Sequence, residues 1–240
     1  PQRVAGYQSC SVHDSATLGK ILRPADVLLV EGERRISTAI KYLTQSTWSH
    51  AALYVGEAVP APPDSGCRGM LIEADIEKGV IAVPLSAYRS FNTRVCRPVG
   101  LSEDHCREVV HFMVDSLGKQ YDLKNVIDLA RYLLPIPPVP SRFRRGMLTL
   151  GSGEPTRAIC STLVAQAFQK IRYPILPEIE HCPDDARGRR MRREIFRIRH
   201  HSLFAPRDFD LSPYFRVVKP TLELGFDYRE IEWDPGEAVG

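Results

Sequence analysis

Cys160 is the residue whose place in the sequence points most directly to chemistry. It follows the loop GSGEPTRAI and begins the run CSTLVAQAFQKI, in which apolar residues recur at helical spacing. A thiol in the first turn of a helix lies at the positive end of the helix dipole, which lowers its pKa and favours the nucleophilic thiolate. The same spacing is typical of a core-facing stripe, and cysteine is among the most buried residue types. Taken alone, the pattern favours a packed thiol, and a catalytic interpretation requires a base and a carboxylate elsewhere.

His50 and Glu73 are the candidates for that base and carboxylate. His50 begins the alternating segment HAALYVGE, although for a histidine on its own a half-buried ring with a backbone carbonyl partner is the favoured interpretation. Glu73 lies in the apolar run GMLIEADI, where an unpaired carboxylate would be costly to bury. A histidine on a neighbouring strand would supply its partner, and the carboxylate would orient the ring and stabilise imidazolium. Asp75, one pleat further along, is the alternative orienting group. Cys160, His50 and Glu73 together predict the catalytic triad of a cysteine hydrolase.

The spacing of apolar residues also predicts the elements that hold these side chains. Strands are expected at ADVLLVEG, SHAALYVGE, MLIEADI, GVIAVPL and NTRVCRPV. Helices are expected at ISTAIKYLT, from Ser102 as N-cap to Leu117, from Asp122 to Leu134, and from Cys160 onward. Because strands and helices are segregated, the fold class is α+β, with a small antiparallel sheet packed against helices. The length favours a single domain over 1–240, with a proline-rich insertion near 134–156 and an arginine-rich C-terminal extension.

Composition narrows the environment in which the protein works. Hydrophobic residues make up 43% and charged residues 25%, and no apolar stretch is long enough to span a bilayer, which predicts a soluble protein. The six cysteines show no C-x-x-C pair, which argues against a disulfide scaffold or zinc ribbon and favours a reducing compartment such as the cytoplasm. The start at Pro1 without a leader leaves a processed, exported form open. No metal or organic cofactor is expected, and the sequence does not indicate an oligomeric state.

One segment, residues 187–201, concentrates basic side chains although the net charge is only +3. Such a run can contact anionic lipid or nucleic acid, but a solvated surface segment is the simpler interpretation. Only Phe196 and then Phe204 interleave with it, so that a stacking platform for nucleic acid is not indicated. An anionic membrane surface is therefore retained as a partner, and nucleic acid is not favoured.

The order of several segments resembles a known family. ADVLLVEG, WSHAALYVG, LIEADIEKGV, GKQYDLKNV and ICSTLVAQAF follow one another as in the circularly permuted, NlpC-like branch of papain-fold cysteine hydrolases, the YiiX-like proteins, which are related to the lecithin:retinol acyltransferase group. The resemblance spans roughly Leu22 to Ile171, and in this family the histidine precedes the cysteine. It implies a permuted papain-like fold with His50 as base, Glu73 as acidic partner and Cys160 as nucleophile. Two positions depart from the pattern: Ala25 stands where Gly is usual, and Ile159 stands where an aromatic residue often precedes the nucleophile.

The resemblance also implies a pocket and a reaction. Tyr121 resembles a pocket residue of the family, and Trp48 and Ser161, next to the proposed triad in sequence, are expected to line the same cleft. The predicted function is a thiol hydrolase that cleaves an amide or ester bond, in a cell-wall peptide or a lipid acyl substrate, through a thioacyl intermediate. Two alternatives remain open. One is an acyltransferase with the same triad, and the other is a noncatalytic module that binds anionic lipid or nucleic acid through residues 187–201.

Overall fold

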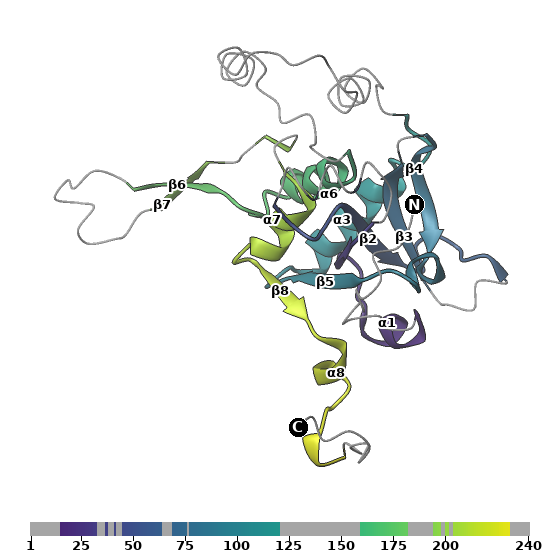
Figure 1. Cartoon of the computed structure of the whole chain (residues 1–240). Coiled ribbons are helices and arrows are strands. Elements are labelled where there is room, and N and C mark those ends of the chain that lie inside the picture. The colour runs from purple at the N-terminus through teal and green to yellow at the C-terminus, as the bar shows by residue number, and fades with distance from the viewer. Residues whose placement is uncertain are drawn as a thin grey trace, which may run out of the picture.

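A six-stranded antiparallel sheet forms the centre of the protein (Figure 1). The computed structural model describes residues 15–32, 37, 41, 45–63, 69–75, 77–120, 159–181, 194–197, 200–201 and 204–230. The strand order is β4-β3-β2-β1-β5-β8. The strands are β1 (Val27–Val30), β2 (His50–Gly56), β3 (Met70–Asp75), β4 (Gly79–Pro84), β5 (Thr93–Pro98) and β8 (Phe215–Val218). Every neighbouring pair is antiparallel, so the expected α+β class with a small antiparallel sheet against helices is confirmed.

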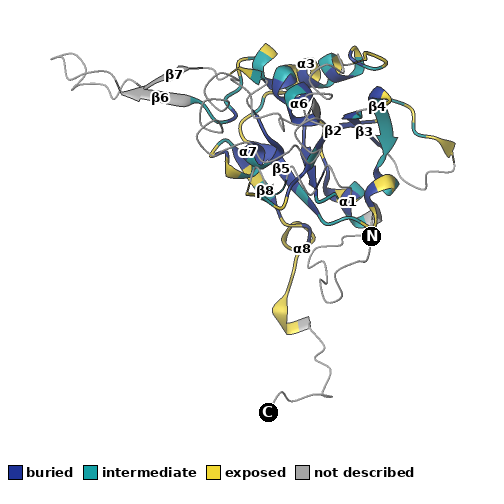
Figure 2. Ribbon diagram, turned by 45° about the horizontal axis from the view of Figure 1, so that its top comes forward, coloured by how far each residue is buried: buried dark blue, intermediate teal, exposed yellow. Residues whose placement is uncertain are grey.

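Helices and turns cover both faces of this sheet. They are α1 (Ser15–Ile21), the 3-10 helix η2 (Leu85–Tyr88), α3 (Glu103–Val114), α6 (Ile159–Lys170) and α7 (Pro206–Leu211). Two short helices, α8 (Pro220–Glu223) and the 3-10 helix η4 (Tyr228–Glu230), follow β8 and are mostly exposed. On one face Leu29 and Leu53 belong to an apolar cluster with α3 and α6, and on the other Leu28 and Leu71 belong to a cluster with α1 and η2. The central strands are buried on both sides, which explains why β1 is a continuous apolar run rather than an alternating one (Figure 2).

The two helices next to the sheet form where the sequence predicts them. The α3 helix starts after Ser102, whose hydroxyl accepts a hydrogen bond from the backbone N–H of His105 at 3.2 Å, and it buries Val109 and Met113. The α6 helix packs against β2 and β3, and Phe168 on its inner face makes an edge contact with Phe215 of β8 at 5.2 Å between ring centroids. The burial of the apolar face of α6 fixes the position of its first turn, which carries Cys160.

Several predicted features fall beyond these elements. The helix expected over 122–134 and the proline-rich insertion near 134–156 lie outside the described residues. Most of the basic segment 187–201 does so too, but its residues 194–197 form β7 (Glu194–Arg197), which pairs antiparallel with β6 (Glu178–His181). Within the described ranges, no helix has both the length and the apolar character needed to cross a membrane.

Candidate active site

The sheet register brings His50 and Glu73 to the same face of neighbouring strands. His50 is the first residue of β2 and lies opposite Val30 of β1. In the β2–β3 pair Leu53 lies opposite Ile72, and continuing this register puts Ala52 opposite Glu73. Glu73 is therefore the diagonal neighbour of His50, within reach of a long side chain. The distance from His50 Nε2 to Glu73 Oε2 is 2.7 Å, and the imidazole N–H donates to the carboxylate.

The alternative orienting group, Asp75, is engaged elsewhere. Its Oδ1 accepts hydrogen bonds from the backbone N–H groups of Glu77 at 2.8 Å and Lys78 at 3.0 Å. These contacts shape the turn between β3 and β4. Glu73, and not Asp75, is thus the carboxylate that contacts His50 in this structure.

A third side chain, Tyr88 of η2, completes the surroundings of the Glu73 carboxylate. The buried Tyr88 hydroxyl donates a hydrogen bond to Glu73 Oε2, the same oxygen that contacts His50. The ring of Tyr88 lies 6.3 Å from that of His50 between centroids. Sequence reasoning missed Tyr88, because no local pattern links a tyrosine after β4 to a glutamate on β3. Its one signal is the burial of Glu73, whose oxygens need donors.

Cys160 lies in the first turn of α6 and interacts with the other side of the His50 ring. Its exposed fraction is 4%, and its interaction with the imidazole is among the causes that raise the pKa of His50. Since Nε2 contacts Glu73, Nδ1 is the ring nitrogen left for the thiol. His50 of β2 therefore interacts with Glu73 of β3 on one side and with Cys160 of α6 on the other.

Opposing influences set the charge of His50. Burial lowers the pKa of His50, but the charge and hydrogen bond of Cys160, followed by those of Glu73, outweigh it and raise the pKa from 6.5 to about 10. Cys160 and Glu73 thus favour the protonated form of the His50 ring. Because the pKa is higher in the folded protein, the resulting stabilisation is fully present below about pH 6.5 and is lost as the pH rises through about 10. The His50 side chain keeps 25% of its surface exposed, so that a substrate can approach it.

The three predicted pocket residues have different outcomes. Trp48 lines a pocket of about 550 Å³, and its Nε1–H donates to Asp210 Oδ2 at 3.0 Å. Ser161 is fully buried, and its hydroxyl donates to the backbone carbonyl of Phe204 at 2.7 Å. Its side chain therefore ties α6 to the segment before α7 and does not line the pocket, contrary to expectation. Tyr121 lies outside the described residues.

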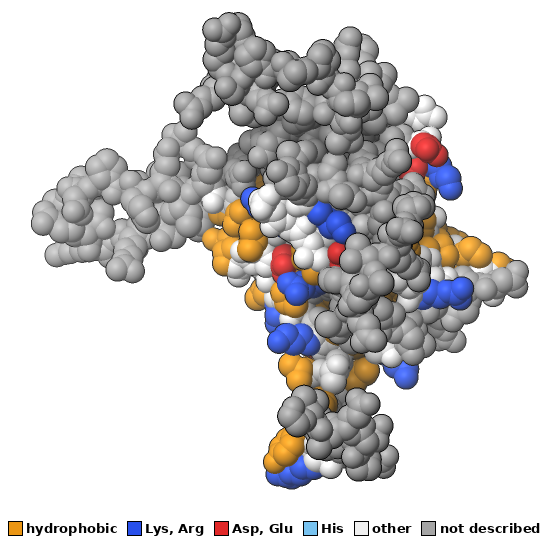
Figure 3. All heavy atoms as spheres, in the orientation of Figure 1, with side chains coloured by type: hydrophobic (Ala, Val, Ile, Leu, Met, Phe, Trp, Pro, Cys, Tyr) orange, Lys and Arg blue, Asp and Glu red, His pale blue; other side chains and the backbone are white. Residues whose placement is uncertain are grey.

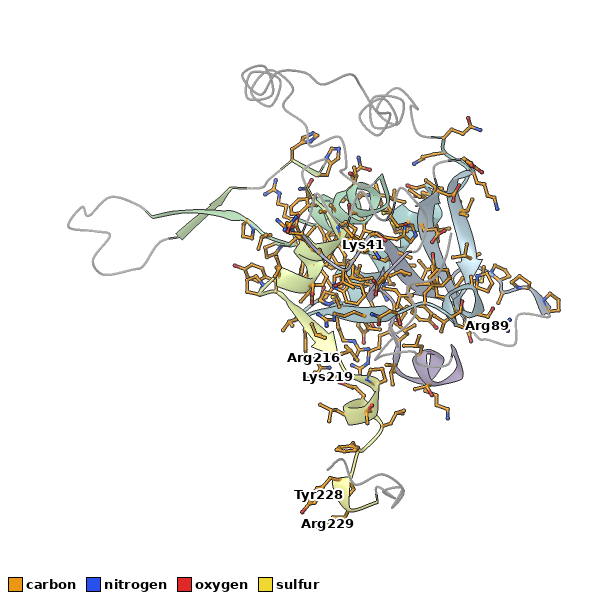
Figure 4. All side chains as sticks on the ribbon, viewed as in Figure 1. Lys41, Arg89, Arg216, Lys219, Tyr228 and Arg229 are labelled. Carbon is orange, nitrogen blue, oxygen red and sulfur yellow. The ribbon has the colours of Figure 1, made fainter. Side chains whose placement is uncertain are left out.

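Trp48, which lines the pocket, is close to His50 in the chain. Trp48 stands two residues before His50, and two consecutive residues of extended chain span at most about 7 Å. Charged side chains dominate the pocket lining: Glu31, Lys41, Arg94, Arg207 and Asp210. On the face shown in Figure 3, basic and acidic side chains lie beside one another near the centre of the body, in the area where Figure 4 labels Lys41. Among the described residues, no cluster of three or more His, Cys, Asp or Glu could hold a metal ion.

Comparisons with known proteins find similarity at the level of structure. No family model matches the chain, and no curated protein matches it. The structure is similar to the crystal structure of the metalloprotein YiiX from Escherichia coli O157:H7, with a TM-score of 0.49 and 17% sequence identity, over 82% of this chain and 96% of that chain. The chain is an α+β protein in which His50 interacts with the thiol of Cys160 and the carboxylate of Glu73.

Proposed function

We propose that the protein is a thiol hydrolase that cleaves an amide or ester bond with Cys160 as nucleophile, His50 as general base and acid, and Glu73 as the group that orients His50. The observation that carries this proposal is that His50 has two partners: it hydrogen-bonds to Glu73 at 2.7 Å, and its interaction with Cys160 contributes to raising its pKa to about 10. Packing alone does not account for this arrangement, because an imidazole and a carboxylate are costly to bury and here they lie with a thiol from the first turn of a helix.

The reaction follows from the charges of these groups. The Cys160 thiolate attacks the substrate carbonyl, and backbone N–H groups at the start of α6, including that of Cys160, stabilise the oxyanion. Protonated His50 gives its proton to the leaving amine or alcohol as the scissile bond breaks, which leaves a thioacyl enzyme. His50 then takes a proton from water as the water attacks the thioester, and the acid product leaves with Cys160 restored as thiolate. A second nucleophile in place of water would give acyl transfer.

Glu73 and Tyr88 act through His50 in this scheme. Glu73 fixes the ring so that Nδ1 faces Cys160 and stabilises the imidazolium, while the Tyr88 hydroxyl fixes the carboxylate. The chain order, with histidine before cysteine, supports the finer proposal of a permuted papain-like domain over 1–240. A cell-wall peptide and a lipid acyl group are the two substrate classes that this chemistry serves.

Competitive thiol labelling tests the proposal without a known substrate. Cys160 is nearly inaccessible, whereas Cys106 is half-buried and has a raised pKa because of burial. If exposure decided reactivity, iodoacetamide would modify Cys106 first. We expect that at pH 6–7 Cys160 reacts at least about tenfold faster than Cys106, as measured by peptide mass spectrometry, and that His50→Ala removes this preference.

Turnover then separates the enzyme from its alternatives. We expect a panel of aryl esters and peptide anilides to yield at least one substrate whose cleavage requires Cys160. A Cys160→Ala protein with undiminished turnover would sink the proposal. An inert thiol, combined with salt-dependent binding to anionic vesicles, would instead favour the noncatalytic module.

A further inference from the structure

The pocket lined by Trp48 contains an arginine that is fixed in place while part of its guanidinium stays available. Arg94 of β5 uses a single nitrogen, Nη1, to donate to both carboxylate oxygens of Asp210, at 2.8 and 2.7 Å. Its guanidinium also lies 5.0 Å from the centroid of the Trp48 ring. Trp48 in turn donates to the same Asp210 carboxylate at 3.0 Å. Asp210 and Trp48 thus hold Arg94 from two sides.

The remaining donors of Arg94 are suited to a ligand. Within the part of the chain that the structure describes, its hydrogen bonds all use Nη1, and none uses Nε or Nη2. The side chain keeps 41% of its surface exposed and lines the pocket. A guanidinium edge with parallel N–H groups matches a carboxylate or phosphate, which it binds through two hydrogen bonds at once. Because Arg94 is already oriented, little side-chain entropy is lost when an anion binds.

The rest of the lining favours an anion over an acyl chain. The pocket carries three cationic side chains, Lys41, Arg94 and Arg207, against the two anionic ones, Glu31 and Asp210. Lys41 is held by Glu31 at 3.1 Å, Arg94 by Asp210, and Arg207 lies 3.8 Å from Asp208, so the lining consists of paired charges. An apolar chain would have to desolvate these charged walls without replacing their contacts with water.

We infer that this pocket binds an anionic group of the substrate, a carboxylate or a phosphate, with Arg94 as its principal contact. The link to catalysis rests on the proposed function and on the position of Trp48, two residues before His50. A substrate whose scissile carbonyl lies at Cys160 would then present its anionic group toward Arg94. This assigns the substrate to polar, acid-bearing compounds and separates it from neutral acyl esters.

Binding can be measured without any turnover, because Arg94 lies against Trp48. The chain has two tryptophans, so a Trp233→Phe background leaves Trp48 as the reporter of fluorescence. We expect N-acetylglutamate, inorganic phosphate or both to change the emission saturably, and the neutral analogue N-acetylglutamine to have no effect. Comparing the two anions identifies which form of the ligand the pocket prefers. Failure of both anions to bind would overturn the inference.

Arginine variants locate the binding. Arg94→Gln should weaken anion binding by about tenfold or more, since hydrogen bonds to charged groups are lost. Arg94→Lys keeps the charge near Asp210 but loses the two-donor edge, so it should also weaken binding even if Arg94→Gln is poorly folded. Arg89→Gln is the matched control, because Arg89 is exposed and lies well away from Lys41 (Figure 4). Equal affinity in the wild type and both Arg94 variants would place the anion elsewhere and overturn the inference.

Turnover distinguishes a failure of this inference from a failure of the proposed function. With paired glutamyl and glutaminyl anilides or esters, Arg94→Gln should raise KM for the acidic member about tenfold and leave the neutral member unchanged. If anions bind through Arg94 but no substrate is cleaved, the inference that the pocket binds an anion is supported and the hydrolase proposal is rejected. If Cys160-dependent cleavage depends neither on substrate charge nor on the Arg94→Gln substitution, the hydrolase proposal is supported and the inference of an anion-binding pocket is rejected.

Discussion

Two buried pairs of opposite charge lie in the same sheet and differ in what they can do. Asp26, just before β1, accepts two hydrogen bonds from Arg97 of β5, at 2.9 and 2.7 Å. Glu73 of β3 accepts from His50 of β2 at 2.7 Å. Both carboxylates are nearly enclosed, and both pairs link neighbouring parts of the sheet. Burial and pairing alone therefore do not mark a catalytic group.

The cation and the third partner separate the two pairs. Arginine stays protonated in proteins, and Arg97 also donates to the backbone carbonyl of Ile21, which ties the end of α1 to the sheet. Burial raises the pKa of Asp26, and the hydrogen bond from Arg97 opposes that change. His50, by contrast, can gain and lose a proton, is partly open to solvent, and has a thiol as its third partner. The first pair has the properties of a structural clamp and the second those of a proton-transfer site.

The largest expected effect is a loss of turnover in Cys160→Ala without a comparable loss of stability. Cys160→Ala should lower turnover by ~10⁶-fold, as for other nucleophiles of catalytic triads. The thermal midpoint should stay within a few degrees, because only one buried sulfur is removed. Steady-state kinetics and calorimetry measure the two quantities, and Cys106→Ala serves as control with wild-type turnover. If Cys160→Ala instead mainly lowers stability, Cys160 has a structural role, as Asp26 and Arg97 do.

The next largest effect is expected at the Asp26–Arg97 pair, where a substitution should lower stability and leave turnover nearly unchanged. Arg97→Met should lower the free energy of unfolding by about 3–5 kcal/mol, because it leaves the Asp26 carboxylate buried without its cation. Chemical denaturation measures this change, and turnover per folded molecule should remain within about twofold of wild type. The double variant with Asp26→Leu should recover part of the loss. A double variant as unstable as the single one would show that the charge of Asp26 is not the cause.

The sequence predicts the pairing of His50 and Glu73 because a physical demand is visible locally. A carboxylate within an apolar strand requires a partner, and a histidine at the start of a neighbouring strand is the obvious one. The contact between Arg94 and Asp210 joins residues 116 positions apart, and no local pattern foretells it. The contact between Tyr88 and Glu73 likewise depends on how the chain turns after β4. Such features depend on tertiary packing and not on periodicity.

Ser161 is a residue that the sequence predicts to line the pocket but that the structure buries. Its place next to Cys160 in the sequence suggests a pocket residue, but each residue of an α-helix rotates the side chain by about 100°. That rotation turns Ser161 into the interior, toward the carbonyl of Phe204. The prediction of α6 and its buried stripe succeeded because the 3.6-residue period is a strong signal over twelve residues. The late strand β8 could not be placed, since it is short and pairs with the distant β5.

The pH dependence tests whether Glu73 tunes His50. Amide turnover should persist to about pH 9 and fall as His50 loses its proton near pH 10. Glu73→Gln removes one of the influences that raise the pKa of His50, so the falling limb should move down by about 1 pH unit or more. Cys160 is the larger of these influences, so part of the shift should remain. Asp75→Asn is the matched control and should leave the limb in place. If the falling limb moves in Asp75→Asn but not in Glu73→Gln, then Asp75, and not Glu73, sets the pKa of His50.

The smallest expected effect isolates one hydroxyl. Tyr88→Phe keeps the aromatic ring, which packs edge-on against Phe91 at 6.0 Å, but removes the hydrogen bond to Glu73. Without that donor the carboxylate is held less firmly, and turnover should fall by about tenfold or less. The falling limb of the pH profile should not move down as it does in Glu73→Gln, since the carboxylate keeps its charge beside His50. Tyr173→Phe is the control, because its hydroxyl donates to the backbone carbonyls of Val99 and Tyr214, at 2.8 and 2.7 Å. Equal losses of stability in the two variants, with a loss of turnover in Tyr88→Phe alone, would show that Tyr88 positions the catalytic pair. Unchanged turnover in Tyr88→Phe would instead make its hydroxyl a structural group like that of Tyr173.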